Sequence, residues 1–155
     1  KTGVEHARAD LFEGRPCFIT PLEDTHPVPL EKVTAFWQSL DMQIIRCSPQ
    51  EHDRILAQVS HLPHFLASAL CNALAKQPLE WKEGSGQGLR DATRIAAGSP
   101  TLWRDVAQQN KEEILVALDL FDEESTNLRR ILEADDWDAL QGWLREGKVF
   151  RDSLE

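Results

Sequence analysis

The chain has 155 residues, of which 41% are hydrophobic and 28% are charged, and its formal net charge is −9. This length suffices for one domain with a substantial core, or for one domain and part of another. The composition is that of a soluble folded protein, and no apolar run is long enough to cross a bilayer. The negative charge argues against non-specific binding to nucleic acid or to an anionic membrane, but it leaves room for a local site that binds an anionic substrate.

Cysteine usage indicates the compartment. Cys17, Cys47 and Cys71 are odd in number, lie far apart and are set in apolar runs. This pattern favours buried thiols in a reducing compartment over disulfides or a zinc site. No signal-peptide pattern opens the chain. We therefore expect a cytoplasmic protein.

The first fifty residues predict a strand–helix–strand unit. Short apolar runs typical of strands occupy residues 16–21 (PCFITP) and 42–47 (MQIIRC). Between them lie a proline-rich loop, residues 22–29, and a helix over about residues 30–40. Two strands do not form a stable sheet alone, and buried strand–helix–strand units belong to larger parallel sheets. We therefore interpret residues 1–48 as the C-terminal tail of an α/β domain.

Residues 48–76 form the clearest predicted helix. Ser48 can cap it, Pro49 falls at the first helical position, and Glu51 completes a capping box. Apolar side chains cover most of its circumference, which is typical of a buried helix. Pro63 removes a hydrogen bond to the Val59 carbonyl, so we expect a kink or a locally opened turn there.

The remaining arc of this helix, about 120° wide, is polar without any Lys or Glu. Its members are small polar groups and imidazoles: Asp53, Ser60, His61, His64, Ser68 and Asn72. The arc suggests a site, although a buried helix can also carry such residues because they bond to one another or to backbone carbonyls. A metal site built on His61, His64 and Asp53 is a further alternative, but no second ligand cluster with recognisable spacing accompanies them.

Residues 77–88 hold three glycines and predict a flexible connection without regular structure. Residues 89–97 then predict a short helix that Gly98 ends. Arg90 and Arg94 are four residues apart, so they share one face of that helix.

Long helices fill the rest of the chain. Ser99 and Pro100 open one that either exceeds thirty residues or breaks near residues 123–126, and a last helix begins at about Asp136. Their apolar stripes exceed the needs of one small bundle, which favours a homodimer. The alternative is that these helices wrap the central helix. The fold class we expect is mainly α, with a short strand–helix–strand remnant of an α/β domain in front.

Three runs of the chain occur together in one order: KTGVEHARADLFEGRPCFITP, EHDRILAQVSHLPHFLASAL and GLRDATRIAAGSPTLWRDVAQQN. In these runs the chain resembles the prephenate dehydrogenase family of tyrosine biosynthesis. The resemblance implies a Rossmann-type nicotinamide-binding domain ending near residue 48 and an all-helical dimerisation and substrate-binding domain over residues 49–155. Members convert prephenate and NAD⁺ or NADP⁺ to 4-hydroxyphenylpyruvate, CO₂ and the reduced cofactor, and some members take arogenate instead.

The chain departs from the family pattern at its beginning. The glycine-rich cofactor turn is absent, and the catalytic histidine, in an HPxxG-type stretch, is expected upstream of Lys1. Lys1 itself is expected near the active-site cleft. On this interpretation the piece is inactive by itself, and the determinants of NAD against NADP lie outside it. Tyrosine is a plausible inhibitor, because product and substrate would share one site.

The resemblance also suggests roles for single residues. Arg94 in TRIA resembles the arginine that pairs with a substrate carboxylate, and a guanidinium fork suits that task. His64 resembles a substrate-binding imidazole, and Trp103 in LWRD resembles a residue at the substrate pocket. The alternatives are a structural ion pair of Arg94 with Asp91 or Asp53 and a core position for Trp103.

Four further residues are expected around this site. His61 is a second candidate for substrate binding, and Asp91 is expected to reach the neighbouring subunit's site. Asp53 and Ser60 are expected to support the site from behind. A non-catalytic helical dimerisation or regulatory module, and a small metal-binding helical protein, are the alternatives from other functional classes.

Overall fold

The structure is a computed structural model that describes residues 3–154, so Lys1 and its expected place near the cleft lie outside the described residues. The described part is mostly helical with one two-stranded parallel sheet, which confirms the expected fold class. The chain divides between Leu56 and Ala57 into two compact units.

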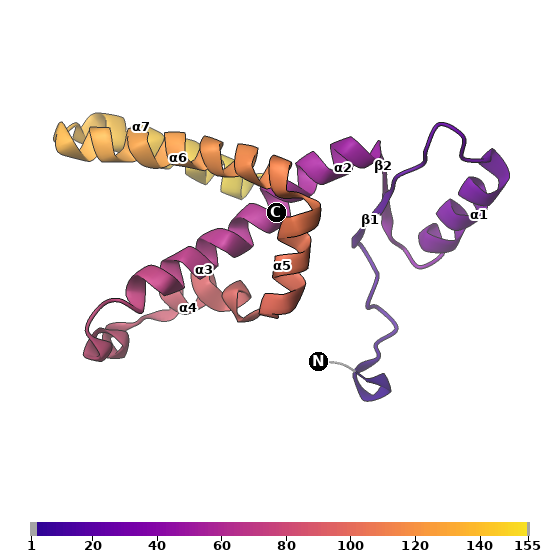
Figure 1. Ribbon diagram of the computed structural model, residues 1–155, viewed down its shortest axis with the longest axis horizontal. Coiled ribbons are helices and arrows are strands. Elements are labelled where there is room, and N and C mark those ends of the chain that lie inside the picture. Colours follow the sequence, from indigo (N-terminus) through magenta and orange to yellow (C-terminus); the bar gives the residue numbers. More distant parts are fainter. Residues whose placement is uncertain (1–2, 155) are drawn as a thin grey trace. The chain divides into compact units, whose positions relative to one another are not determined.

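The first unit holds the predicted strand–helix–strand arrangement. It consists of the 3-10 helix η1 (Val4–His6), β1 (Pro16–Ile19), α1 (Pro27–Gln38), β2 (Gln43–Arg46) and α2 (Pro49–Leu56). β1 and β2 pair in parallel, with Pro16 opposite Gln43 and Ile19 opposite Arg46 (Figure 1). The guanidinium of Arg46 donates to Thr34 Oγ1 over 2.8 Å, which ties α1 to β2.

The helix α1 begins earlier than the predicted residue 30. The ring nitrogen Nδ1 of His26 accepts the Val28 N–H over 3.2 Å, and Pro27 occupies the first helical position. The proline-rich stretch, which we interpreted as a loop, therefore supplies the helix start, because a proline at this position gives up no hydrogen bond.

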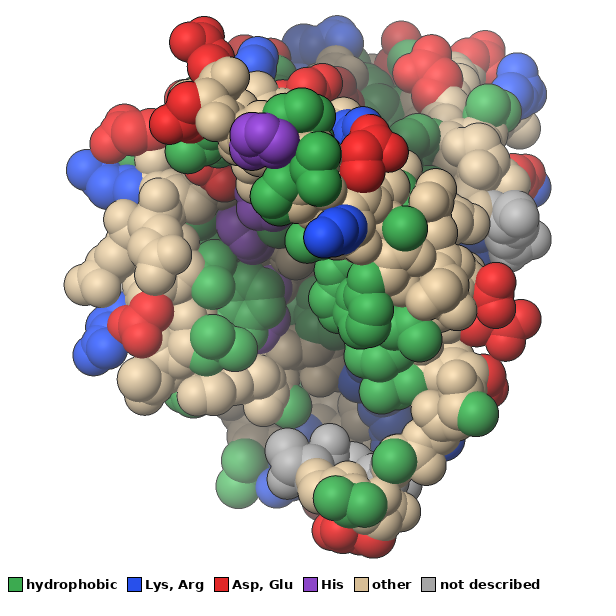
Figure 2. All heavy atoms as spheres, turned by 90° about the vertical axis from the view of Figure 1, so that its right-hand side faces the viewer, with side chains coloured by type: hydrophobic (Ala, Val, Ile, Leu, Met, Phe, Trp, Pro, Cys, Tyr) green, Lys and Arg blue, Asp and Glu red, His purple; other side chains and the backbone are tan. Residues whose placement is uncertain are grey.

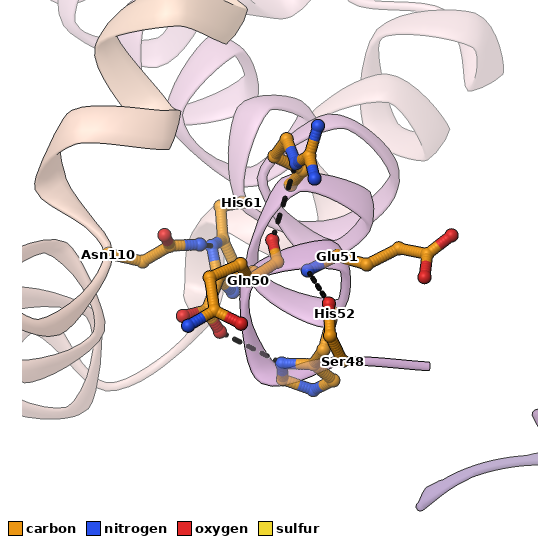
Figure 3. Close-up of polar contacts among 8 residues, drawn as sticks. Ser48, Gln50, Glu51, His52, His61 and Asn110 are labelled. Carbon is orange, nitrogen blue, oxygen red and sulfur yellow. Dashed lines mark hydrogen bonds and ion pairs between the residues drawn. The ribbon is translucent and has the colours of Figure 1, made fainter. Parts of the chain in front are cut away.

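The central helix has the predicted start and the predicted irregularity. Ser48 Oγ accepts the Glu51 N–H over 3.1 Å (Figure 3). The second unit continues from α2 with the π-helix η2 (Ala57–His61) and then α3 (Leu62–Leu74). The π-helix lies just before Pro63, which confirms the locally opened turn expected there.

The expectation that this helix is buried is only partly right. Ala57, His61, His64 and Ala67 are buried, but Val59 is 66% exposed. Within the second unit, η4, α4 and α6 pack on this helix and leave Val59 uncovered.

The segment after α3 is more regular than predicted. The 3-10 helix η3 (Leu79–Gly84) lies within the stretch that we expected to be irregular. The single short helix predicted next is divided into α4 (Gln87–Thr93) and the 3-10 helix η4 (Arg94–Ala97). Gly98 ends η4, as predicted.

Three helices complete the second unit: α5 (Pro100–Gln109), α6 (Lys111–Glu133) and α7 (Trp137–Asp152). Ser99 Oγ caps α5, as predicted. The start of α7 near Asp136 is also confirmed, and the Asp136 carboxylate caps it by accepting the Ala139 N–H. The break between α5 and α6 falls at Asn110 and not near residues 123–126, so that prediction was wrong. Asn110 has φ −123° and ψ 33°, which no α-helix accommodates.

The core of the second unit lies where η2 meets α6. Ala57, Ile114 and Ala117 are buried there, and Leu62, Phe65 and Leu118 pack around them. The two alanines, which are 1% and 0% exposed, let the backbones of η2 and α6 approach closely.

The helices α6 and α7 lie side by side (Figure 1), and the Trp143 indole N–H donates to Glu124 Oε2 over 2.8 Å between them. Many large apolar side chains on both helices remain exposed: Leu115, Val116, Leu120, Phe121, Leu132, Leu144, Val149 and Phe150. Figure 2 shows apolar side chains at the surface among acidic and basic ones. Within residues 3–154 no helix has the length and apolar character needed to cross a membrane. The three cysteines are free and half-buried, not fully buried as expected.

Candidate functional site

A groove of about 780 Å³ lies between α3, η4 and the start of α5. We call it the His64 groove. One wall is the polar arc of α3, where His64, Ser68 and Asn72 follow one another at four-residue spacing. The other wall includes Thr93, Ala96, Ala97 and Gly98 from the end of α4 to the end of η4, and Trp103 from α5. The volume falls within the range of small-molecule sites in proteins.

Two stacked rings belong to the groove lining. His64 and Trp103 are stacked, with ring centroids 3.5 Å apart and planes 10° apart. Phe65 meets the same indole edge to face at 5.8 Å. Trp103, predicted either at the substrate pocket or in the core, is half-buried and lines the groove. The pair presents both an apolar surface and nitrogen groups to anything bound in the groove.

His64 is only 5% exposed. Burial lowers the pKa of His64 below its ordinary value of 6.5, because the positive form loses its hydration there. The imidazole is therefore neutral at neutral pH. A neutral imidazole has one N–H donor and one acceptor nitrogen. His64 can therefore donate a hydrogen bond to a ligand oxygen from one ring nitrogen and accept one at the other.

Gly98 makes the stacking possible. A Cβ at this position would lie 2.6 Å from Trp103 Nε1 and 2.9 Å from His64 Cε1. Both distances are shorter than van der Waals contact, so only glycine lets η4 end this close to the two rings. The sequence analysis identified Gly98 only as a helix stop. The close approach depends on contacts between α3, η4 and α5, which local sequence does not encode.

His61 lies behind the groove and does not line it. It is 9% exposed, and its Nδ1 lies 3.2 Å from Nδ2 of Asn110, which is 8% exposed (Figure 3). Its ring meets Trp103 edge to face at 6.1 Å. Asn110 was not among the residues predicted for the site. Its only local signal is an asparagine inside a long helical pattern, and we placed that helix's break elsewhere.

Arg94 is exposed at the first position of η4, between groove residues Thr93 and Ala96. Its guanidinium forms no ion pair with any described residue, so the structure lends no support to the alternative of a structural pair with Asp91 or Asp53. The Asp91 carboxylate instead accepts a hydrogen bond from Gln87 Nε2 over 2.8 Å.

Ser60, which was expected behind the site, is not among the groove-lining residues. Ser60 is exposed within η2. Asp53 belongs to the first unit, where its carboxylate pairs with Nδ1 of His52 over 2.9 Å. Among residues 3–154, no three His, Cys, Asp or Glu side chains gather closely enough to hold a metal ion.

Comparison with known proteins gives one consistent family. Residues 48–146 match the sequence model described as prephenate dehydrogenase, dimerization domain. Prephenate dehydrogenase of Bacillus subtilis (strain 168) is 32% identical over 158 residues, which covers 99% of this chain and 42% of the relative.

Solved structures agree with the sequence match. The crystal structure of prephenate dehydrogenase from Aquifex aeolicus in complex with hydroxyphenyl propionate and NAD⁺ superposes with a TM-score of 0.92 at 32% identity, covering 100% of this chain and 55% of that one. Synechocystis arogenate dehydrogenase superposes with a TM-score of 0.85 at 27% identity, covering 94% and 54%. The chain thus spans about half the length of the relatives it matches.

Proposed function

Because the chain belongs to the prephenate dehydrogenase family, we propose that it forms the substrate-binding and dimerising part of an enzyme that oxidises and decarboxylates prephenate to 4-hydroxyphenylpyruvate. The observation that carries the proposal is the His64 groove with its stacked His64–Trp103 pair. Arg94, which forms no ion pair within residues 3–154, adjoins the groove-lining residue Thr93. The Aquifex aeolicus relative supports it, because that enzyme binds hydroxyphenyl propionate, which combines a phenol ring with a carboxylate.

Substrate binding follows from the chemistry of these side chains. Prephenate is a dianion built on a six-membered ring, so it needs a flat apolar surface and a carboxylate partner. Trp103 supplies the surface, and Arg94 supplies a guanidinium whose fork matches a carboxylate. Neutral His64 supplies a hydrogen bond that orients the bound ring.

The reaction places few demands on acid–base chemistry in this part of the enzyme. Loss of the ring carboxylate as CO₂ and departure of hydride from C4 leave an aromatic ring, and aromatisation drives the step. The nicotinamide cofactor, NAD⁺ or NADP⁺, supplies the hydride acceptor when it is bound. The task of Arg94, His64 and Trp103 is then to hold the substrate in one orientation.

Residues 20–26 do not provide the phosphate-binding turn of a dinucleotide site. The connection from β1 to α1, residues 20–26, holds no glycine, so it cannot be the turn that cradles a dinucleotide phosphate. We assign residues 1–48 to the tail of the nicotinamide-binding domain and residues 49–155 to the helical domain, which agrees with a family match that begins at residue 48. We assign cofactor binding mainly to the nicotinamide-binding domain, of which residues 1–48 would be the tail.

We assign the exposed apolar side chains of α6 and α7 to a homodimer interface. Soluble monomers rarely expose so many large apolar residues on neighbouring helices, and the matched family domain is a dimerisation domain. Asp91 is exposed and remains our candidate for a contact with the neighbouring subunit's site.

Arogenate is the alternative substrate, favoured by the likeness to Synechocystis arogenate dehydrogenase. It shares the ring and the ring carboxylate with prephenate, so the same groove would hold it. Tyrosine shares the aromatic ring and a carboxylate with these ligands, and we propose it as a competitive inhibitor at this groove.

Calorimetry on the full-length protein tests the site, with hydroxyphenyl propionate as the probe. We expect His64→Ala to weaken probe binding about tenfold, because the variant loses one hydrogen bond and one ring contact, together worth roughly 1–2 kcal/mol. The affinity for NAD⁺ should stay unchanged in the same variant. Weakened NAD⁺ binding with intact probe binding would refute the assignment.

A further inference from the structure

Asn110 interrupts what would otherwise be one continuous helix. Its backbone still takes part in both neighbours, because its N–H donates to the Val106 carbonyl over 3.0 Å and its carbonyl accepts the Ile114 N–H over 3.1 Å. Its φ and ψ of −123° and 33° nevertheless separate α5 from α6. The side chain at this break is 8% exposed, and Figure 3 shows it directed at His61. A buried asparagine at a helix break, bonded to a residue 49 positions earlier, calls for a physical reason.

The contact with Asn110 favours one tautomer of His61. An amide NH₂ group can only donate, so Nδ2 of Asn110 requires an acceptor at Nδ1 of His61, 3.2 Å away. In the tautomer that this contact favours, Nδ1 carries its lone pair and the proton of the neutral ring sits on Nε2. A doubly protonated imidazolium has no acceptor, and it would lose this bond in a buried place.

His61 in turn contacts the wall of the groove. Its ring meets Trp103 edge to face, at 6.1 Å and 81°, and Trp103 stacks on His64 at 3.5 Å. An edge-to-face contact depends on which ring edge is presented, and that edge changes if the imidazole rotates. A chain of contacts thus leads from the helix break through His61 and Trp103 to His64.

We propose that Asn110 is a positioning residue for the His64 groove. It fixes the ring orientation of His61 and keeps its proton on Nε2, and through His61 it holds Trp103 flat against His64. The consequence for substrate binding rests on the proposed function. The consequence for the state of His61 does not.

The test of the His61 state is nitrogen NMR of the full-length protein labelled with ¹⁵N-histidine. These 155 residues contribute five histidines to the spectrum, and the His61 signal is identified by its loss in His61→Gln. We expect an unprotonated Nδ1 and a protonated Nε2 in the native protein. Asn110→Asp keeps the size of the side chain but replaces the donor with a carboxylate that only accepts, so Nδ1 should become protonated. Gln109→Glu is the matched control, because it adds the same charge at the adjacent, exposed residue.

A protonated Nδ1 in the native protein would overturn the proposal, whether or not the variants fold. An unchanged His61 signal in Asn110→Asp, or the same change in Gln109→Glu, would overturn it as well.

The second readout is kinetic and uses the same full-length variants. We expect Asn110→Asp to raise the KM for the substrate about tenfold while the KM for the cofactor stays constant, and Gln109→Glu to leave both unchanged. Equal changes in both KM values would contradict a positioning role at the groove. If the native protein showed no dehydrogenase activity at all, the proposed function would fail, while the NMR result would still decide the state of His61.

Discussion

Replacing Gly98 with alanine tests the geometry of the groove with a single methyl group. The new Cβ would lie 2.6 Å from Trp103 Nε1, 2.9 Å from His64 Cε1 and 3.1 Å from Trp103 Cδ1. Neither ring can yield easily, since His64 is buried and the two rings are stacked on each other. The backbone itself accepts alanine, because Gly98 has φ −63° and ψ 159°. The substitution therefore measures crowding and not backbone strain.

Overpacking of this kind costs about 1–3 kcal/mol of unfolding free energy. At about 2 kcal/mol we expect the Tm of the full-length protein to fall by roughly 4–8 °C. Affinity for hydroxyphenyl propionate should fall as well, because the indole and the imidazole must separate or shift to admit the methyl group.

Gly86→Ala is the matched control. Gly86 is also extended, with φ −87° and ψ −177°, and a Cβ there would meet nothing within 4 Å. Both substitutions reduce the conformational entropy of the unfolded chain equally, which stabilises both variants by the same amount. The difference in unfolding free energy between them therefore measures the cost of the clash at Gly98. If thermal unfolding finds Gly98→Ala as stable as Gly86→Ala, and probe binding is unchanged, the stacked geometry is wrong.

Three further predictions concern other parts of the second unit. Burial lowers the pKa of His64 in the folded state, so as the pH drops the imidazole of the unfolded chain is protonated before that of the folded chain. The free energy of unfolding should therefore fall as the pH drops through about 6.5 toward the lower pKa of the folded state. Urea titrations at a series of pH values should show a smaller decline for His64→Gln. Gly142 and Gly147 lie within α7, and a Cβ at either position would have open space around it. Gly142→Ala and Gly147→Ala should therefore each raise the free energy of unfolding by about 0.5–1 kcal/mol. A lower stability in calorimetric melts would indicate that the new methyl group meets a neighbour. Leu120→Glu places a charge on the exposed apolar face of α6 and should shift the dimer toward monomer in analytical ultracentrifugation, whereas an unchanged dimer would locate the interface elsewhere.

Local signals in the sequence predicted most elements correctly. Ser48 with Pro49, and Ser99 with Pro100, mark helix starts by chemistry that acts within four residues, and both starts are confirmed. The effect of Pro63 is equally local, because a missing N–H disturbs the turn that precedes it.

The features that shape the groove were harder to predict, because they depend on residues far apart in the chain. Asn110 ends a helix whose apolar pattern continues past it, and its partner His61 lies 49 positions away. Gly98 also serves as an ordinary helix stop, so its second role is visible only where two rings meet it. The helix start at Pro27 was missed for a different reason, since histidine is not among the preferred capping residues.

The assignment of Arg94 to a substrate carboxylate is the central claim, and a dehydrogenase assay on the full-length protein tests it most directly. Prephenate or arogenate is supplied with NAD⁺ or NADP⁺, and reduced cofactor is followed in the native protein and in Arg94→Ala. We expect activity with at least one pair, and a KM for that substrate about 30-fold or more higher in Arg94→Ala, because removing one partner of a desolvated charge pair costs roughly 2–5 kcal/mol. An unchanged KM in Arg94→Ala would contradict the carboxylate assignment, and an inactive native protein with every pair would contradict the proposed reaction.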